Sequence, residues 1–169
     1  MGPRVRKIQR RDDAVLAIEQ THDLAELTAL LAAVGLPADG PEQANRCCLA
    51  ARVGGRPVGV AAVETRLDVA VLGTLAVIAE RRRQGIGTAL LAGARSAAHT
   101  RGARNFYALA PPSVAEFLRR SGFAPAPMSE ATTALRGTLI GDRLTVDPLN
   151  PASCQAWLLD ISSDGIIHR

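Results

Sequence analysis

The segment from residue 75 to residue 91 has the residue types and spacing best suited to chemistry. It reads LAVIAERRRQGIGTALL, an apolar run followed by three arginines, two glycines and apolar residues at helical spacing. The start of a helix leaves backbone N–H groups without intrahelical partners and places partial positive charge there. Glycines at 85 and 87 let a phosphate approach the backbone closely. The pattern predicts a site for an anionic group such as a pyrophosphate.

Other phosphate-binding motifs do not fit this segment. A Rossmann fingerprint would need a third glycine where Leu90 stands, and a P-loop needs Gly-Lys followed by Ser or Thr. Glycines at a strand-to-helix turn also occur for packing alone. The residues by themselves therefore leave two interpretations open, an anion site and a packed turn.

The apolar residues on either side of this segment have two kinds of spacing, one typical of strands and one typical of helices. The ten nearly all-apolar residues 69–78 indicate a central strand buried on both faces, and Gly54-Gly55 predicts a tight hairpin turn. Helices are expected to begin near Leu24, Ile86 and Pro111. Strands are expected at 14–18, 46–53, 57–64, 69–78, 105–110, 136–140 and 156–161. The order predicts a mixed α/β domain without internal repeats.

Length and composition limit the class of protein. A chain of 169 residues suits one domain, which we place at 14–169 after a basic N-terminal arm at 1–13. Its net charge of +4 would suit nucleic acid, but one Tyr, one Trp and three Phe offer few stacking platforms. Three cysteines do not make a disulfide framework, and no apolar run reaches the ~18 residues of a membrane span. We expect a cytoplasmic protein that does not bind a membrane, and an anionic small molecule is favoured over nucleic acid as its partner.

The segment 82–87, RRQGIG, matches the R/Q-x-x-G-x-G/A motif and resembles that of the GNAT (GCN5-related) N-acetyltransferases. Val77 and Glu80 stand where that family often has V-x-P-E, and Gly122-Phe123 resembles its G-F after the last helix. The likeness covers residues 14–161. It implies an α/β fold (mixed, α+β type): a central, mostly antiparallel sheet flanked by helices, with splayed parallel strands at the acetyl-CoA site.

The resemblance also implies roles for particular residues. Backbone amides of 83–88 would hold the coenzyme A pyrophosphate, residues 75–77 would pair with the pantetheine arm, and strands near Val77 and Phe106 would hold the thioester. Ser113 would either touch the coenzyme or cap a helix. The implied coenzyme-binding residues are Leu75, Ala76, Val77, Arg82, Arg83, Gln84, Gly85, Ile86, Gly87, Thr88 and Ser113.

A closer likeness is to the arsenic-resistance and amino-acid N-acetyltransferases. It rests on the segments LLAAVGLP (30–37), VGVAAVE (58–64), AEFLRRSGF (115–123) and PAS (151–153), and on the L-x-x-LAV of residues 72–77. These relatives tend to carry Arg-Ser where this chain has Gly73-Thr74. An arginine that could grip a substrate carboxylate is therefore missing. They also tend to carry Thr where Pro111 and Pro112 stand.

The sequence offers one candidate for the general base of the reaction and lacks the family's usual general acid. Many family members use a Tyr four residues before the Gly of G-F, and here that position is Leu118. The single tyrosine, Tyr107, lies in a predicted strand and is expected to be a packing residue. Glu64 is the best candidate for the general base, with an exposed carboxylate at a strand end as the alternative interpretation. Adjacent Cys47 and Cys48 point to opposite faces of a strand, so no metal site is expected.

The chain is therefore predicted to be an acetyl-CoA-dependent N-acetyltransferase that acts on the primary amine of a small molecule. An amino acid, an amino-acid-like toxin or an antibiotic would fit. The alternative is a GNAT-fold acyl-CoA-binding sensor with little or no catalysis, which Leu118, Gly73 and the two prolines would suit. Nucleic-acid binding through the arm and Arg81–Arg83 is a third hypothesis. A homodimer is left open.

Overall fold

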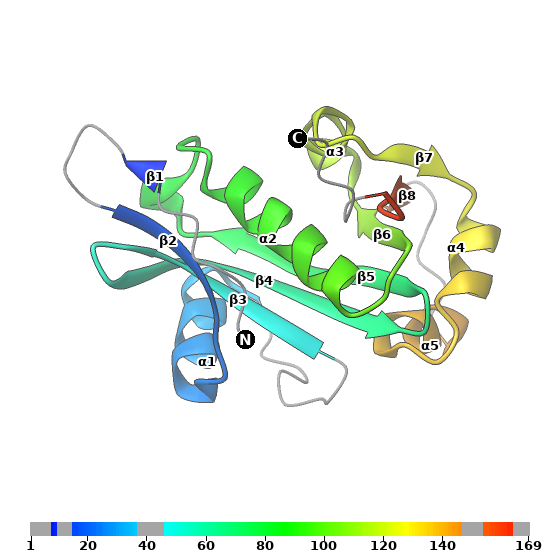
Figure 1. Ribbon diagram of the computed structural model, residues 1–169, viewed down its shortest axis with the longest axis horizontal. Coiled ribbons are helices and arrows are strands. Elements are labelled where there is room, and N and C mark those ends of the chain that lie inside the picture. The colour runs from blue at the N-terminus through cyan, green and yellow to red at the C-terminus, as the bar shows by residue number, and fades with distance from the viewer. Residues whose placement is uncertain (1–7, 10–14, 37–45, 147–153, 164–169) are drawn as a thin grey trace. The chain divides into compact units, whose positions relative to one another are not determined.

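The computed structural model describes residues 8–9, 15–36, 46–146 and 154–163. In this part of the chain the strands follow the order β1-β2-β3-β4-β5-β6-β8-β7 (Figure 1). The chain divides into two compact units, Met1–Val63 with Thr74–Ala97 and Glu64–Gly73 with Ala98–Arg169. Within the predicted arm, Ile8–Gln9 form β1 and the other residues lie outside the described ones, as does the segment 151–153.

The first unit is built on antiparallel neighbours. Its strands are β1, β2 (Val15–Gln20), β3 (Arg46–Val53), most of β4 (Arg56–Arg66) and the second half of β5 (Val69–Val77). Strand β2 pairs with β3 so that Leu16 lies opposite Val53. Gly54 and Gly55 have φ values of +57° and +80°, which side-chain-bearing residues rarely adopt. The predicted hairpin between β3 and β4 is confirmed.

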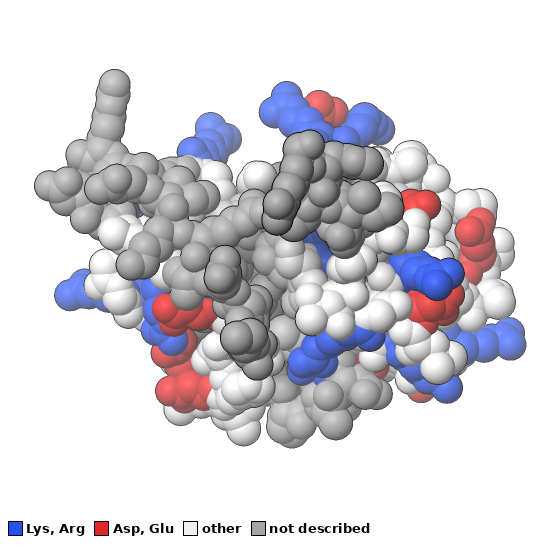
Figure 2. All heavy atoms as spheres, in the orientation of Figure 1, with Lys and Arg blue, Asp and Glu red and all other residues white. Residues whose placement is uncertain are grey.

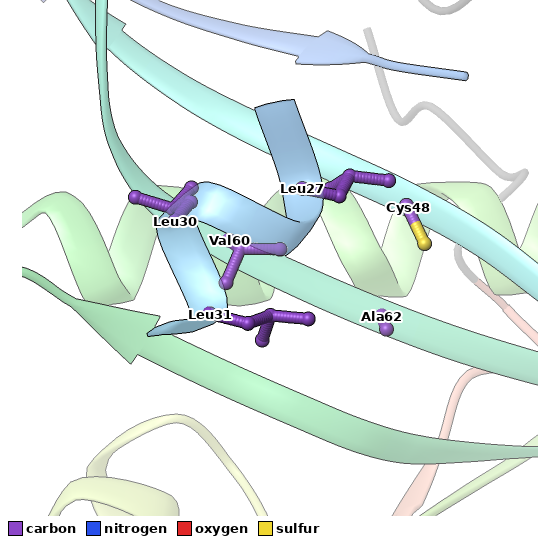
Figure 3. Close-up of a cluster of buried hydrophobic side chains, with 6 residues drawn as sticks. All are labelled: Leu27, Leu30, Leu31, Cys48, Val60 and Ala62. Carbon is purple, nitrogen blue, oxygen red and sulfur yellow. The ribbon is translucent and has the colours of Figure 1, made fainter. Parts of the chain in front are cut away.

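Helix α1 (Leu24–Ala33) covers one face of these strands. Asp23 is its N-cap, and the side chain accepts a hydrogen bond from the Glu26 amide at 3.1 Å. The buried side chains facing the strands come from one stripe of the helix, as the spacing predicted. Figure 3 shows them directed at the strand residues of one cluster, whose members are Leu27, Leu30, Leu31, Cys48, Val60 and Ala62.

Helix α2 (Ile86–Thr100) packs on the opposite face of the same strands. A Cβ added at Gly93 would lie 3.2 Å from Leu49, the strand neighbour of Cys48. A Cβ added at Gly59 would lie 2.9 Å from Leu90 of the helix. The two glycines therefore let helix and strands approach closely at two points. The first unit is thus a sheet between two helices.

The second unit continues with parallel and antiparallel pairs. Its strands are the first half of β5, β6 (Asn105–Ala110), β7 (Ala124–Ala126) and β8 (Gln155–Asp160). Residues 69–72 of β5 pair in parallel with 105–108 of β6. Both β6 and β7 pair antiparallel with β8. The sheet is therefore mixed and mostly antiparallel, as expected.

A short helix follows β6 in the second unit. A 3-10 turn (Pro112–Val114) leads into α3 (Ala115–Arg120), so the helix expected from Pro111 begins four residues late. Phe106 and Phe123 meet with ring centroids 5.6 Å apart and tilted by 56°. Arg119 lies over the ring of buried Trp157, 5.5 Å from its centroid.

The strand predicted at 136–140 is wrong. Two helices that the sequence analysis did not predict, α4 (Met128–Ala134) and α5 (Leu139–Val146), occupy this region, and β7 was also missed. Gly137 has a φ of +82°, which breaks an extended strand. The fully buried Thr138 then accepts a hydrogen bond from the Gly141 amide at 2.9 Å, the pattern of a helix N-cap. These local contacts turn a short apolar run into a helix start.

Candidate active site

The glycine-rich segment forms a turn between the end of β5 and the start of α2. After Val77 comes a single 3-10 turn (Ala79–Arg81), and α2 begins at Ile86. Arg83 and Gly85 both have left-handed backbone conformations, with φ values of +60° and +77°. Left-handed residues interspersed in a turn direct successive N–H groups toward one side, which forms a concave anion site. The strand end and the helix start that flank the turn lie where the sequence predicted them.

The amides of this turn have no side-chain cap among the residues that the structure describes. In the part of the chain that the structure describes, no side chain accepts a hydrogen bond from the amides of residues 84–88, and the first turn of α2 contains no acidic residue. The Ala89 amide donates to the Gly85 carbonyl and starts the helical ladder. Since Arg83, Gly85 and Thr88 are exposed, the turn is accessible to an anionic ligand.

The side chain of Arg82 turns back toward the strand. Its Nε donates a hydrogen bond to the carbonyl oxygen of Val77 at 3.0 Å. The first residue of the motif therefore braces the loop against the end of β5. Arg83 remains exposed beside it, and its guanidinium adds positive charge to the turn.

The burial of strand β5 decreases along its length. Ala70 and Val71 are fully buried, whereas Gly73 is exposed and residues 74–77 are half-buried. The prediction of a strand buried on both faces is thus confirmed for its first half and wrong for its second. The reason is pairing: the register with β6 covers residues 69–72, and β5 continues for five residues more. Those five residues include the predicted pantetheine-binding segment 75–77.

The candidate base Glu64 lies near the end of β4, where its side chain is buried rather than exposed. The residue is 6% exposed, and both carboxylate oxygens accept the N–H of Leu139, at 2.8 and 3.0 Å. Leu139 is the first residue of α5. The alternative of an exposed strand-end carboxylate is therefore wrong, and the carboxylate has a defined partner.

The remaining sequence candidates lie in the second unit. Leu118, at the position of the missing tyrosine, is 2% exposed. Tyr107 is buried in a cluster with α4, which confirms it as a packing residue, and burial raises the pKa of its hydroxyl above the ordinary value. Ser113 is exposed in the 3-10 turn, and no side chain caps α3, so its predicted capping role is wrong.

The sequence analysis missed the residues that surround Glu64. Arg66 donates from a guanidinium nitrogen to the carbonyl oxygen of Arg136 at 3.1 Å. The turn at 136–139 thus contacts two residues of β4. A signal was present in the sequence, since Thr138 is a residue type that favours an N-cap and Asp142 lies four residues later, in the first helical turn. The partner of that helix start was not visible from the pattern.

Three further features were sought among the described residues: metal ligands, a basic surface and a membrane-spanning helix. No group of three or more His, Cys, Asp or Glu within them is arranged to hold a metal ion. At the top of Figure 2 basic and acidic side chains meet over α3, where Glu116 pairs with Arg119 at 3.2 Å and with Arg120 at 3.1 Å. These two arginines therefore do not form an unopposed basic surface. None of the helices in the described ranges has the length and apolar character of a membrane span.

Comparison with known proteins agrees with this geometry. Residues 15–123 match the profile of the family described as acetyltransferase (GNAT) family. The matched region extends from the first residue of β2 to the glycine-phenylalanine pair after α3. No curated protein sequence matches the chain.

Solved structures with the same fold are distant in sequence. The ribosomal-protein-S18-alanine N-acetyltransferase from Escherichia coli is 18% identical with a TM-score of 0.65, over 91% of this chain and 99% of that one. N-acetylglutamate synthase from Neisseria gonorrhoeae, solved with coenzyme A and N-acetyl-glutamate, is 20% identical with a TM-score of 0.68, over 91% of this chain and 35% of that one. An aminoglycoside 6'-N-acetyltransferase complexed with coenzyme A is 15% identical with a TM-score of 0.65, over 85% and 96%. The predicted mixed α+β fold is confirmed.

Proposed function

Because the chain belongs to the acetyltransferase (GNAT) family, we propose that it transfers an acetyl group from acetyl-CoA to the primary amine of a small molecule. The observation that carries this proposal is the turn at residues 83–88. It has two left-handed residues, and within the described residues no side chain accepts a hydrogen bond from the amides of 84–88. A diphosphate would accept hydrogen bonds from these amides and gain from the α2 dipole. The exposed Arg83 would add charge stabilisation.

The pantetheine arm would extend along the second half of β5. Residues 75–77 are half-buried and lie beyond the last β5 residue paired with β6. A pantetheine chain carries amide groups, so it can pair with such a strand as a further strand would. The predicted thioester position beside both Val77 and Phe106 is not part of this proposal, because Phe106 pairs with Ala70, seven residues before Val77. The remaining predicted contacts, including Ser113, belong to it.

The reaction is a direct displacement at the thioester. The neutral amine attacks the carbonyl carbon, the new N–C bond forms, the C–S bond breaks, and the thiolate of coenzyme A leaves. Two acceptors are open for the proton of the ammonium, the carboxylate of Glu64 and solvent water. The buried Leu118 cannot donate a proton to the thiolate, because its side chain has none to give. We assign that protonation to water.

A second part of the proposal concerns the class of amine that accepts the acetyl group. The sequence segments shared with the arsenic-resistance and amino-acid N-acetyltransferases favour an amino acid, an amino-acid-like toxin or an antibiotic in the cytoplasm, and a role in resistance. The names of the structural neighbours include acceptors as different as a ribosomal protein and an aminoglycoside. Gly73-Thr74 offers no cation for a substrate carboxylate. Amines without that carboxylate therefore belong in the test.

Two measurements test the proposal. Calorimetry should detect association of coenzyme A, and a thiol-release assay with acetyl-CoA should detect turnover on at least one member of a panel of amino acids, aminoglycosides and simple amines. Absence of coenzyme binding would contradict the proposal entirely. Tight binding with no turnover on the whole panel would favour the acyl-CoA sensor instead.

A further inference from the structure

The backbone at the end of β5 presents its polar groups to two different edges. The Ile78 amide, directly after β5, donates to the carbonyl oxygen of Val58 in β4 at 2.9 Å. The carbonyl oxygen of Ala76 lies on the same side, 3.1 Å from a Cβ added at Gly59 of β4. Successive residues of a strand direct their N–H and C=O groups to opposite edges. Val77, between these two residues, therefore directs both of its groups to the edge away from β4.

In the described part of the chain this second edge has no partner strand at Val77, because the pairing of β5 with β6 ends at Leu72. Leu75 directs its groups to the same edge as Val77, since the two are two residues apart. A pantetheine arm that pairs with β5 would thus meet the N–H and C=O groups of Leu75 and Val77. Both residues, and the turn that follows them, belong to the first compact unit.

One of these four groups is already occupied. The Nε–H of Arg82 donates to the Val77 carbonyl oxygen at 3.0 Å. A guanidinium has donors only, so it satisfies this carbonyl and offers no acceptor in exchange. The groups left to a ligand at this edge are the N–H of Val77 and both groups of Leu75.

The path from the glycine-rich turn to Val77 therefore presents donors. The amides of residues 84–88 find no side-chain acceptor among the described residues, and the guanidinium of Arg83 is exposed beside them. The next backbone group that is left for a ligand is the Val77 N–H. Such a path suits a ligand that presents the oxygens of a diphosphate and then a carbonyl oxygen. From the diphosphate outward, pantetheine presents a hydroxyl and a carbonyl before its first N–H.

We infer that Arg82 is a positioning residue for the coenzyme arm: it occupies the Val77 carbonyl, so that the first carbonyl of the arm pairs with the Val77 N–H. This inference rests on the proposed acetyl transfer, because the arm is that of acetyl-CoA. An arm that presented its N–H at this point would meet a carbonyl that Arg82 already satisfies. Since a strand residue advances about 3.3 Å, a change of register would displace the thioester along β5 by roughly that distance or more.

The test compares coenzyme A with its nucleotide half, which ends at the diphosphate and lacks the arm. Calorimetry gives both affinities, and their ratio isolates the contribution of the arm. Arg82→Ala removes the donor to Val77, whereas Arg82→Gln keeps an N–H donor without the charge. Arg83→Ala is the matched control, because it removes an exposed arginine of the same turn and leaves the Arg82 contact with Val77 in place.

The expected pattern follows from the occupied carbonyl. Arg82→Ala should lower the affinity for coenzyme A about fivefold to tenfold more than the affinity for the nucleotide half, the size of an exposed charge-assisted hydrogen bond. Arg82→Gln should restore the parent ratio, and Arg83→Ala should weaken both ligands by the same factor. The kcat with acetyl-CoA should fall by about tenfold or more in Arg82→Ala, because the thioester is displaced.

Two results would overturn the inference. The first is a ratio in Arg82→Ala equal to that of the parent chain, since a lost charge or a loosened turn weakens both ligands alike. The second is a ratio that stays low in Arg82→Gln, because the N–H donor would then not be what sets the arm.

The same measurements separate this inference from the proposed function. If the parent chain binds coenzyme A but acetylates no amine, acetyl transfer fails and the ratio still tests Arg82. If the parent chain acetylates an amine and the ratio does not respond to Arg82→Ala, only the positioning role fails. A parent chain that binds neither ligand contradicts both.

Discussion

The Nε–H of Arg82 donates to the carbonyl oxygen of Val77 across five residues, at 3.0 Å. This single contact joins the start of the glycine-rich turn to the end of the strand that would hold pantetheine. It therefore fixes the direction in which the chain leaves the sheet. The arginine at the first position of the motif acts on the backbone geometry, in addition to any effect of its charge on an anion.

Replacement of Arg82 should separate these two effects. Arg82→Ala is expected to weaken coenzyme A binding by roughly fivefold to tenfold, since the bond is charge-assisted but exposed. Arg82→Gln can still donate an N–H to Val77 and should recover most of the affinity. Calorimetry at two salt concentrations is the measurement. Equal losses in both variants would mean that the charge, rather than the brace, matters.

Gly85 should be needed for both backbone conformation and access. Its φ of +77° makes Gly85→Ala cost about 1 kcal/mol in the free energy of unfolding. The added methyl group would also face the proposed diphosphate, so coenzyme A affinity should fall by about tenfold or more. Gly54→Ala is the control, because Gly54 has a φ of +57° and open space around it. Comparable weakening of coenzyme A binding in both variants would contradict the proposed site.

Gly59 lies where helix α2 crosses β4 and the end of β5. A Cβ there would be 2.9 Å from Leu90 and 3.1 Å from the carbonyl oxygen of Ala76. Gly59→Ala is therefore expected to lower stability by about 1–3 kcal/mol, the cost of overpacking. Because the carbonyl belongs to the predicted pantetheine-binding segment, coenzyme A binding should weaken too. Chemical denaturation and calorimetry on one preparation would show whether the two losses occur together.

Leu118 occupies the position at which many family members have tyrosine. Since its side chain is 2% exposed, Leu118→Tyr would place extra volume and a hydroxyl in a packed site. We expect a loss of about 1–3 kcal/mol in stability and no gain in kcat. Leu118→Met is the matched control, with a similar volume. A faster, fully stable Leu118→Tyr enzyme would show that the position opens to the active site.

Stability should decline at alkaline pH because of Tyr107. Burial first, and then the charges of Glu130 and Asp68, raise the pKa of its hydroxyl in the folded chain above 10.0. A group with a raised folded pKa contributes its stability in full below the unfolded value, and that stability is lost as pH rises through the folded value. Tyr107→Phe should abolish this loss above about pH 10. Since the chain has one tyrosine, its ultraviolet absorbance reports the titration directly.

Much of the fold could be predicted from local patterns. Strands β3 and β6 have the predicted bounds, and helices α1 and α2 start at the predicted Leu24 and Ile86. The two strands are apolar runs bounded by polar or turn residues, and the two helices have apolar residues at helical spacing. The run at 136–140 was too short to distinguish strand from helix. Its outcome depended on Gly137 and Thr138, whose backbone contacts lie within a few residues but do not appear in an apolar pattern.

The glycine-rich turn was predictable for the same reason, because a strand, two glycines and a helix start are all local features. The sequence by itself thus determined the element order from β2 to α3, the fold class and the candidate anion site. Only the tertiary structure decided that Glu64 would meet an amide 75 residues away and that Leu118 would be enclosed in the core. Periodicity reports which face of an element is apolar, whereas the partner of a buried charge depends on which distant segment folds against it.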